Sequence, residues 1–384
     1  MRKVYVDNAA TTFPKPKEVS MAMCEYIEGV GGNVGRGTYE SSYEAGRVLF
    51  ETRELLCNRF NFNNPLNVVF TSNITESLNT IIKGYLRAGD HVLVSSMEHN
   101  AVIRPLNSEL MNGVGVTKVN CRKDGTLDVL EFEKAVKSNT KLVVMTHASN
   151  VCGTIMPVKE VGEICKKNNI PFVLDSAQSA GVLDVDFNEF NLSALAFTGH
   201  KGLLGPQGVG GFLIKDDFAK KIRPLKEGGT GSFSEDEAQP EILPDKFECG
   251  TLNMPGIYGL NASLKYIENK GIKNIREYEE ALTKAFLNKI LNIEGVALSG
   301  IQGAEGRTSV FSLNFKTLDN SEAAFILDRE FGIMTRVGLH CAPSAHKTLG
   351  TFPSGSVRVS FGQFNTLEDV DYVASSLLKT IKGV

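Results

Sequence analysis

Two side chains in the middle of this sequence have the types and positions that amine chemistry needs. Lys201 follows a strand-like run at residues 194–197, and Asp175 follows another at residues 172–174. A partly desolvated lysine loses its proton more easily and can form a Schiff base, and a nearby acid can keep a heteroaromatic nitrogen protonated. These are the requirements of pyridoxal phosphate catalysis. Each residue alone equally suits a structural role, as a surface lysine or as a helix-capping acid.

A possible phosphate site lies upstream of this pair. The segment TSNITES, residues 71–77, follows an apolar run at residues 68–70 and precedes a helical pattern. The start of a helix leaves N–H groups unpaired at the positive end of its dipole, which suits a phosphate group. Asn73 and Glu76 have the spacing of a capping box, so any well-capped helix would look the same.

The cysteines raise the question of a reactive thiol. The sequence has seven, widely spaced and without a CxxC pair, so we expect neither a disulfide framework nor a cysteine-based zinc site, and we expect most of them to be buried. Cys341 differs, because it lies among small residues in RVGLHCAPSAH after a predicted strand. A thiolate is a strong nucleophile, and Arg336, His340 and His346 would favour that form if they face the sulfur.

The elements that must position these residues alternate along the chain. Helical patterns cover residues 74–85, 128–138 and 158–168, and they separate strand-like runs at residues 68–70, 91–94, 141–146, 171–174, 194–197 and 209–214. Strands that alternate with helices predict an α/β fold with a mostly parallel sheet. In such sheets ligands bind where the carboxyl ends of the strands meet the loops.

The last third of the chain has a different pattern. Residues 227–245 are rich in glycine and acids and predict either a solvated loop or a lid over a site. Beyond them come two long helical patterns at 257–269 and 275–293, strand-like runs at 308–315 and 356–361, and a closing helix at 367–381. This mixture predicts a smaller α+β domain that begins near residue 257.

Composition excludes several classes of protein. Of 384 residues, 42% are hydrophobic and 22% are charged, which allows an ordinary globular core and excludes a mainly disordered chain. The net charge of −3 gives no basic excess for nucleic acid. No apolar run is long enough for a membrane span, and the amino terminus becomes polar by Asp7. We therefore expect a soluble cytoplasmic protein with neither nucleic acid nor membrane as a partner.

Ordered motifs along nearly the whole chain are similar to those of one known group. They are YVDNAATT (5–12), GNVGRGTYESSYEAG (32–46), EHNAV (98–102), HASNVCGT (147–154), LDSAQSAG (174–181), TGHKGLLGPQGVG (198–210), CGTLN (249–253), RVGLHCAP (336–343) and VRVSFGQFNT (357–366). On these motifs the chain resembles the fold-type I pyridoxal-phosphate enzymes of the class V aminotransferase family, and within them the cysteine desulfurases and selenocysteine lyases. The resemblance implies a large domain at 15–256 with a mainly parallel seven-stranded sheet, a small α+β domain from 1–14 and 257–384, and a homodimer.

The resemblance also implies roles around the cofactor ring. Lys201 would hold pyridoxal 5'-phosphate as a Schiff base, Asp175 would bind the pyridine nitrogen, Gln178 would bind the ring oxygen and His99 would stack on the ring. Without its EHNAV context, His99 would be interpreted as a buried structural imidazole. No metal ion is implied.

Further roles follow for the phosphate group and for the substrate. Thr75, Thr198 and His200 would hold the phosphate with backbone N–H groups near Ile74, and Thr251 would reach the site of the neighbouring protomer. Asn150 and Arg358 would take the substrate carboxylate, with Arg358 as a bidentate fork. The alternation of Ser356, Arg358 and Ser360 with valines places this arginine on a polar strand face, which a surface arginine would also show.

Cys341 occupies the position at which this family forms a persulfide. The implied reaction converts L-cysteine to L-alanine and passes the sulfur to an acceptor protein. Three alternatives stay open: selenocysteine lyase action, a class V aminotransferase in which Cys341 is idle, and a cofactor-binding protein without activity. Leu339 and Ile74 depart from the family pattern, which has a second histidine before the cysteine and a second threonine in the phosphate loop.

Overall fold

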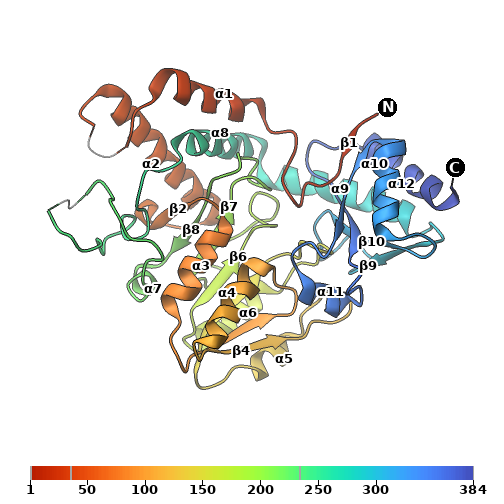
Figure 1. Ribbon diagram of the computed structural model, residues 1–384, viewed down its shortest axis with the longest axis horizontal. Coiled ribbons are helices and arrows are strands. Elements are labelled where there is room, and N and C mark those ends of the chain that lie inside the picture. The colour runs from red at the N-terminus through yellow and green to blue at the C-terminus, as the bar shows by residue number, and fades with distance from the viewer. Residues whose placement is uncertain (1, 35–36, 233–234, 384) are drawn as a thin grey trace.

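The computed structural model describes residues 2–34, 37–232 and 235–383. Gly35 and Arg36 of the 32–46 motif, and Phe233 and Ser234 of the 227–245 segment, lie outside these ranges. A seven-stranded sheet forms the centre of the larger part of the molecule (Figure 1). Its strands are β2 (Val68–Thr71), β3 (His91–Ser95), β4 (Gly115–Val119), β5 (Thr140–Thr146), β6 (Phe172–Asp175), β7 (Ala194–Thr198) and β8 (Gly210–Ile214).

The order of strands in this sheet is β2-β8-β7-β6-β5-β3-β4. Only β8 runs antiparallel to its neighbours β2 and β7, and the remaining pairs are parallel. The mainly parallel α/β sheet predicted from the alternating pattern is thereby confirmed. The carboxyl ends of β5, β6 and β7 lie at one edge, where Thr146 is paired with Asp175 and Asp175 with Ala196.

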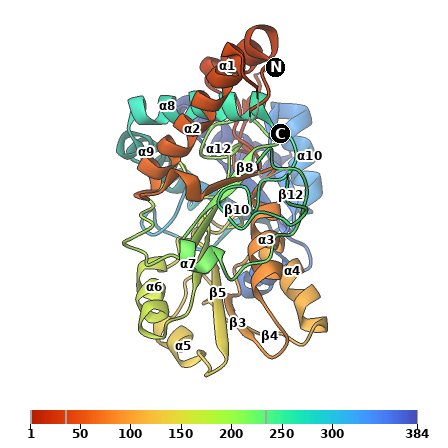
Figure 2. The same cartoon turned by 90° about the vertical axis from the view of Figure 1, so that its left-hand side faces the viewer.

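Helices cover both faces of the sheet, as Figure 2 shows from the side. One face packs against α3 (Ile74–Tyr85) and α4 (Asn100–Met111), and the other against α2 (Glu40–Phe60), α6 (Val158–Lys167) and α8 (Met254–Lys270). Alternate residues of each strand enter the two cores, as Val92 and Leu93 do in β3. Because both faces are buried, the strands are continuous apolar runs.

A second sheet lies beside the first, at the right of Figure 1. It is antiparallel, with the order β12-β13-β10-β9. Its strands are β9 (Val296–Ser299), β10 (Val310–Phe315), β12 (Arg336–Gly338) and β13 (Ser356–Ser360). It shares a separate core with α9 (Ile272–Ile290), α10 (Asn320–Phe331) and α12 (Leu367–Lys382). Near the amino terminus, β1 (Val4–Tyr5) pairs with β11 (Ile333–Met334), so the chain starts on this side of the molecule. The division into domains at residues 15 and 257 stays a prediction.

Short elements account for most differences from the sequence-based expectations. Strand β4 was not predicted, because at the sheet edge its five residues are only partly buried and include a glycine and a lysine. Helix α5 (Val129–Lys134) ends four residues earlier than the pattern at 128–138. The remaining short helices are α1 (Lys17–Glu25), α7 (Asp216–Ala219) and α11 (Pro343–Leu349).

Candidate active site

The predicted amine and acid lie together at the carboxyl edge of the large sheet. Asp175 is the last residue of β6, and Lys201 follows the end of the neighbouring β7 by three residues. Burial lowers the pKa of Lys201 to about 8, while the Asp175 carboxylate opposes the shift. At neutral pH about a tenth of such amines would be uncharged, compared with fewer than about one in a thousand for an ordinary lysine. The amine is therefore prepared to act as a nucleophile.

Asp175 is buried with one protein hydrogen-bond donor beside it. The N–H of Ala177 donates to Asp175 Oδ1 at 2.9 Å. Burial raises the pKa of Asp175, and this hydrogen bond and the charge of Lys201 oppose the rise. A buried carboxylate needs a positive or hydrogen-bonding partner, and a protonated ring nitrogen supplies both.

A second carboxyl group lies behind the first. Glu98 is fully buried, accepts a hydrogen bond from Ser95 Oγ at 2.5 Å and another from the Thr146 N–H at 2.8 Å. Burial raises the pKa of Glu98 to about 8, and the charge of Asp175 adds to the rise. Glu98 thus joins the ends of β3 and β5 and is protonated at neutral pH.

His99 directly follows Glu98 and caps α4. Its Nδ1 accepts a hydrogen bond from the Ala101 N–H at 3.0 Å, so the proton of the neutral ring is on Nε2. Burial lowers the pKa of His99 to about 4, and the charges of Lys201 and Arg336 lower it further. A neutral imidazole beside the amine is compatible with stacking on a ring, which stays a prediction.

The proposed phosphate end contains several unpaired polar groups. Thr198 Oγ1 and His200 Nδ1 are buried and have no hydrogen-bond partner among the described residues. At the start of α3, Asn73 Oδ1 accepts from the Glu76 N–H at 3.0 Å. Glu76 in turn accepts from Ser72 instead of from Asn73, so the capping box is half formed.

The amides of Ile74 and Thr75, in the first turn of α3, form no hydrogen bond within the described ranges. Ile74 is buried and Thr75 is exposed. Free amides, a free hydroxyl and a free imidazole nitrogen are the groups that a phosphate would satisfy. The residues present therefore fit the phosphate group of the cofactor, and the loss of a second threonine at Ile74 leaves its backbone N–H available.

Thr251 lies near the start of α3. It is exposed in the loop before α8, on the rim of a depression that it shares with Ser72 and Glu76. Its predicted role requires the site of a neighbouring protomer and stays a prediction.

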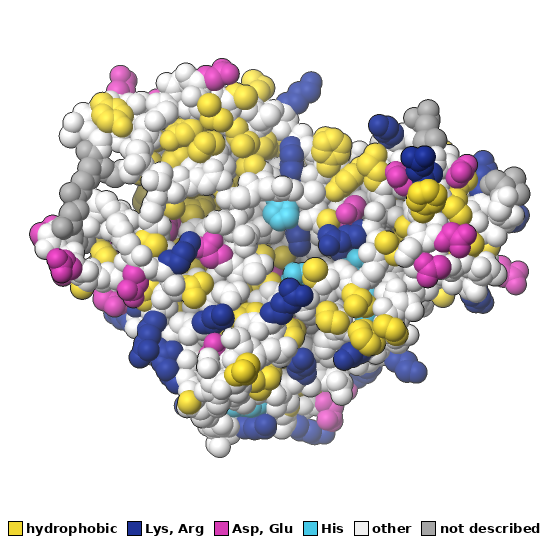
Figure 3. Space-filling model, in the orientation of Figure 1, with side chains coloured by type: hydrophobic (Ala, Val, Ile, Leu, Met, Phe, Trp, Pro, Cys, Tyr) yellow, Lys and Arg dark blue, Asp and Glu magenta, His cyan; other side chains and the backbone are white. Residues whose placement is uncertain are grey.

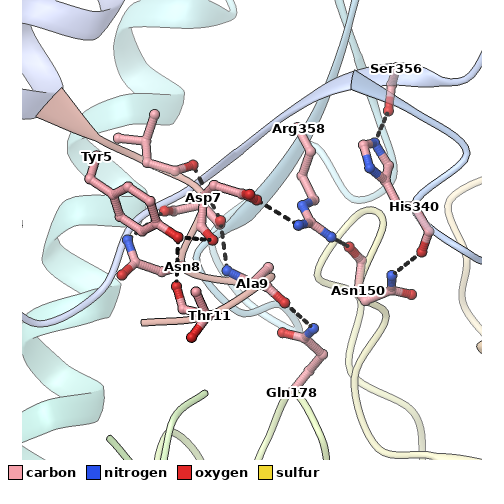
Figure 4. A network of polar contacts seen from close by, with 12 residues as sticks. Tyr5, Asp7, Asn8, Ala9, Thr11, Asn150, Gln178, His340, Ser356 and Arg358 are labelled. Atoms are coloured by element: carbon pink, nitrogen blue, oxygen red, sulfur yellow. Dashed lines mark hydrogen bonds and ion pairs between the residues drawn. The ribbon is translucent and has the colours of Figure 1, made fainter. Parts of the chain in front are cut away.

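Arg358 and Asn150 are in contact, as Figure 4 shows, and their predicted binding of a substrate carboxylate stays a prediction. Arg358 is the central residue of β13 and is 2% exposed, so the polar strand face predicted for it is a buried one. Its Nη1 donates to Asn150 O at 3.0 Å, and its Nη2 forms an ion pair with Asp7 Oδ1 at 2.7 Å. Gln178 Nε2 donates to Ala9 O at 2.9 Å in the same network. Burial lowers the pKa of Arg358, and Asp7 opposes this shift.

Cys341 lies on an exposed turn that two contacts connect to these groups. The Asn100 N–H, next to His99, donates to Cys341 O at 2.8 Å. Asn150 Nδ2 donates to His340 O at 2.7 Å. His340 and Cys341 both have positive φ, 47° and 57°. The thiol-bearing turn is therefore attached to the residues beside His99 and Arg358.

The two histidines near Cys341 in the sequence are buried, whereas the Cys341 side chain is exposed. His340 is buried with Nε2 3.2 Å from Ser356 Oγ, and burial lowers its pKa to about 2. His346 is buried, its Nδ1 is 2.7 Å from Thr351 Oγ1, and burial lowers its pKa to about 4. Both rings are neutral at neutral pH, so the condition under which they would favour the thiolate is not met. Arg336 remains as an exposed cation of the same segment.

The cysteines are less buried than predicted. All seven are free, and Cys57, Cys152 and Cys165 are buried, whereas Cys24 and Cys341 are exposed. Among the described residues, no three His, Cys, Asp or Glu side chains are placed to hold a metal ion. On the face in Figure 3, basic and acidic side chains are interspersed, and several histidine and Lys or Arg side chains gather near its middle.

Asp7 and Glu98 had no role in the sequence-based site. Both belong to motifs that pointed to it, and Asp7 comes soon after the short strand β1, just as Asp175 lies at the end of β6. An acid at a strand end was the available signal. Glu98 had none beyond its position before His99.

A large sheet with an amine and an acid at its carboxyl edge, beside a smaller sheet that carries a buried arginine, defines the fold-type I class of pyridoxal-phosphate enzymes. The sequence model described as "Aminotransferase class-V" matches residues 4–373. The chain belongs to the class V aminotransferase family.

Within this family, the chain is similar to proteins and solved structures that are named cysteine desulfurases. A probable cysteine desulfurase from Methanothermobacter thermautotrophicus is 36% identical over 97% of this chain and 94% of its own, and a cysteine desulfurase from Haloferax volcanii is 30% identical over 97% and 88%. The apo structure of the cysteine desulfurase from Thermococcus onnurineus superimposes with a TM-score of 0.94 at 34% identity, covering 100% of this chain and 95% of that one. The S-sulfonic acid form of a cysteine desulfurase from Escherichia coli gives a TM-score of 0.88 at 25% identity, with coverage of 100% and 95%.

Proposed function

We propose that the protein is a pyridoxal-phosphate-dependent cysteine desulfurase, which converts L-cysteine to L-alanine and retains the sulfur as a persulfide on Cys341. One observation carries the proposal. The turn of Cys341 is hydrogen-bonded to Asn100, beside His99, and to Asn150, whose carbonyl oxygen accepts from Arg358. The segment that pairs with Arg358 through Asp7 also contacts Lys201 through Thr12, which supports one site for the amine, the arginine and the thiol.

The chain has a suitable group for each part of the cofactor. Lys201 Nζ would bond to it, Asp175 would hold the proton on the ring nitrogen, and Gln178 and His99 would contact the ring. The unpaired groups of Thr198 and His200, with the amides of Ile74 and Thr75, would hold the phosphate. When bound, pyridoxal phosphate supplies an electron sink for charge that develops at the substrate α-carbon.

The protein residues then divide the work on the substrate. Arg358 and Asn150 bind the α-carboxylate and orient the α-carbon. Lys201 Nζ, with its lowered pKa, removes the α-proton as a general base. The Cys341 thiolate forms an S–S bond with the substrate sulfur as the C–S bond breaks. The electron pair of that bond stays with carbon, which takes up a proton and becomes the methyl group of alanine.

We propose a homodimer and a protein acceptor for the sulfur as well. Gly229–Ser232 and Thr251 line an open depression together with Phe50 of α2, a surface that a second copy would cover. Cys341 is exposed, as a thiol that passes sulfur to another protein must be. Among the described residues, no helix is long and apolar enough to cross a bilayer.

The reaction is tested on the purified protein loaded with pyridoxal phosphate. Alanine and sulfide or selenide are measured from L-cysteine and from L-selenocysteine, with and without a thiol reductant. We expect one alanine per sulfide from cysteine, and Cys341→Ser should keep the visible absorbance of the bound cofactor while sulfide release falls at least about 100-fold.

Cys24→Ser, which alters another exposed thiol, is the matched control and should retain activity. Full sulfide release by Cys341→Ser would contradict the persulfide step. Conversion of pyruvate to alanine with another amino acid as donor would favour the aminotransferase, and turnover of selenocysteine alone would favour the lyase.

A further inference from the structure

The segment that follows β1 touches both sides of the candidate site. At its start, Asp7 forms the ion pair with Arg358 of the small sheet. In its middle, Ala9 O accepts the hydrogen bond from Gln178 Nε2. At its end, Thr12 Oγ1 donates to Lys201 O at 2.8 Å. Eleven residues, from Tyr5 to Lys15, therefore connect the arginine with the lysine. Figure 4 shows the arginine end of this segment.

The lysine end of this segment is firmly fixed. The carbonyl oxygen of His200, directly before Lys201, accepts three hydrogen bonds: from the Thr12 N–H at 3.1 Å, from Thr11 Oγ1 at 3.1 Å and from Lys15 Nζ at 2.6 Å. One carbonyl with three donors, one of them charged, holds the segment and the turn together.

The arginine end is fixed through the main chain of Asp7 and its neighbours. The Ser360 N–H donates to Val6 O at 2.7 Å, and Asn8 Nδ2 donates to Ser360 O at 2.9 Å. Tyr5 Oη donates to Asp7 O at 3.1 Å. These contacts with Ser360, at the end of β13, fix the backbone that carries the Asp7 carboxylate. A surface acid, in contrast, changes rotamer freely.

Arg358 has a definite orientation as a result. Its Nη1 is bound to Asn150 O and its Nη2 to Asp7, whereas its Nε is buried and has no partner among the described residues. A buried arginine without a counter-charge is costly, and Asp7 is the acid that pairs with it. Nε is therefore the one nitrogen of this guanidinium for which the described residues supply no partner.

We propose that Asp7 is a positioning residue for the substrate, which holds the Arg358 fork at a fixed place relative to Lys201 so that its unpaired Nε–H receives the α-carboxylate. This inference rests on the proposed function, in which Arg358 binds that carboxylate. Asp7 acts through Arg358 and does not touch the reacting atoms.

The test uses the cofactor-loaded protein and ligands with and without a carboxylate. Binding of L-alanine and of ethylamine is followed by the change in the visible absorbance of the cofactor. Asp7→Ala should weaken L-alanine binding about 10- to 100-fold and leave ethylamine binding within about twofold. With cysteine as substrate, KM should rise by the same factor while kcat changes less than about threefold.

Asp7→Asn keeps an oxygen that can accept from Nη2, so it should recover most of the L-alanine affinity. In the cofactor-free protein, Asp7→Ala should lower the melting temperature by several degrees, because it leaves a buried guanidinium unpaired. Asp184→Ala, which breaks an exposed ion pair with Arg59, is the control and should change neither quantity.

Arg358→Ala distinguishes a failure of the proposed role of Arg358 from a failure of the proposed role of Asp7. If it leaves L-alanine binding unchanged, the proposed role of Arg358 is wrong. If it weakens binding while Asp7→Ala does not, only the role of Asp7 fails. Tighter L-alanine binding in Asp7→Ala, or equal losses in Asp7→Ala and Asp7→Asn, would also overturn the inference.

Discussion

Lys201 and Cys341 both lie a few residues beyond a strand, but Lys201 is buried and Cys341 is exposed. Lys201 follows β7 in a turn whose carbonyl groups are held by the amino-terminal segment, and burial shifts the pKa of its amine. Cys341 follows β12 on an exposed turn with positive φ, and the imidazoles of His340 and His346 are neutral and buried. Burial thus lowers the pKa of the amine, whereas the thiol is left exposed and accessible to solvent.

The largest expected effect is that substitutions of Lys201 and of Cys341 affect different steps of the reaction. In the proposed reaction, exchange of the substrate α-proton in D2O requires Lys201 as the base and does not require the thiol. Lys201→Ala should slow this exchange at least about 1000-fold. Cys341→Ala should keep it within about threefold while it abolishes sulfide release. Exchange is measured by NMR on L-cysteine or L-alanine with the cofactor-loaded protein.

Equal loss of exchange in both variants would contradict this division of roles, because the thiol would then take part in proton transfer. Lys215→Ala, an exposed lysine at the start of α7, is the control for a lost amine and should behave as the unaltered protein.

A smaller effect is expected in the pH dependence of stability. Burial lowers the pKa of every histidine of the chain, at residues 91, 99, 147, 200, 340 and 346. Below pH 6.5 the unfolded chain therefore binds protons that the folded chain does not, and the free energy of unfolding falls as the pH falls. Glu98, Asp175 and Glu279 have raised pKa values and act in the opposite direction.

Because the histidines outnumber these carboxyl groups by six to three, we expect the free energy of unfolding to be lower at pH 5 than at pH 6. Urea unfolding of the cofactor-free protein at the two pH values measures it. His147→Asn near the sheet edge and His346→Asn near the thiol should each reduce the pH dependence by about one group. An unchanged dependence in one of them would show that burial differs between the two regions.

The smallest expected effect concerns the backbone of the thiol turn. A side chain in the left-handed region costs about 1–2 kcal/mol, and glycine avoids this cost. Cys341→Gly should therefore raise the free energy of unfolding by about 1 kcal/mol, after the greater entropy of the unfolded glycine is included. Cys24→Gly, in helix α1, should lower it by a few tenths of a kcal/mol. Destabilisation by Cys341→Gly in urea unfolding would show that the turn is not strained.

The sequence allowed good prediction where local patterns decide the structure. The strands that became β2, β3, β5, β6, β7 and β8 were predicted because each is a buried apolar run, and their order placed Asp175 and Lys201 at one edge. Partly buried β4 lacks such a run and was missed. The family resemblance contributed Gln178, Asn150 and Thr251, whose residue types alone indicate no role.

Contacts between distant parts of the chain could not be predicted in this way. No periodicity shows that Asp7 pairs with Arg358, or that Asn100 binds the carbonyl of Cys341. The direction in which a histidine points depends on such packing too. The sequence left open whether His340 and His346 face the sulfur, and in the structure they are hydrogen-bonded to Ser356 and Thr351.

The ion pair of Asp7 and Arg358 spans 351 positions of the chain, which has a consequence for synthesis on the ribosome. At about 5–20 residues per second, translation needs roughly 20–70 s to pass from one partner to the other. The strands around Lys201 are complete by Ile214, so that part can fold while the arginine has not yet been made. A nascent chain would then carry the amine of Lys201 before it carries the guanidinium charge of Arg358.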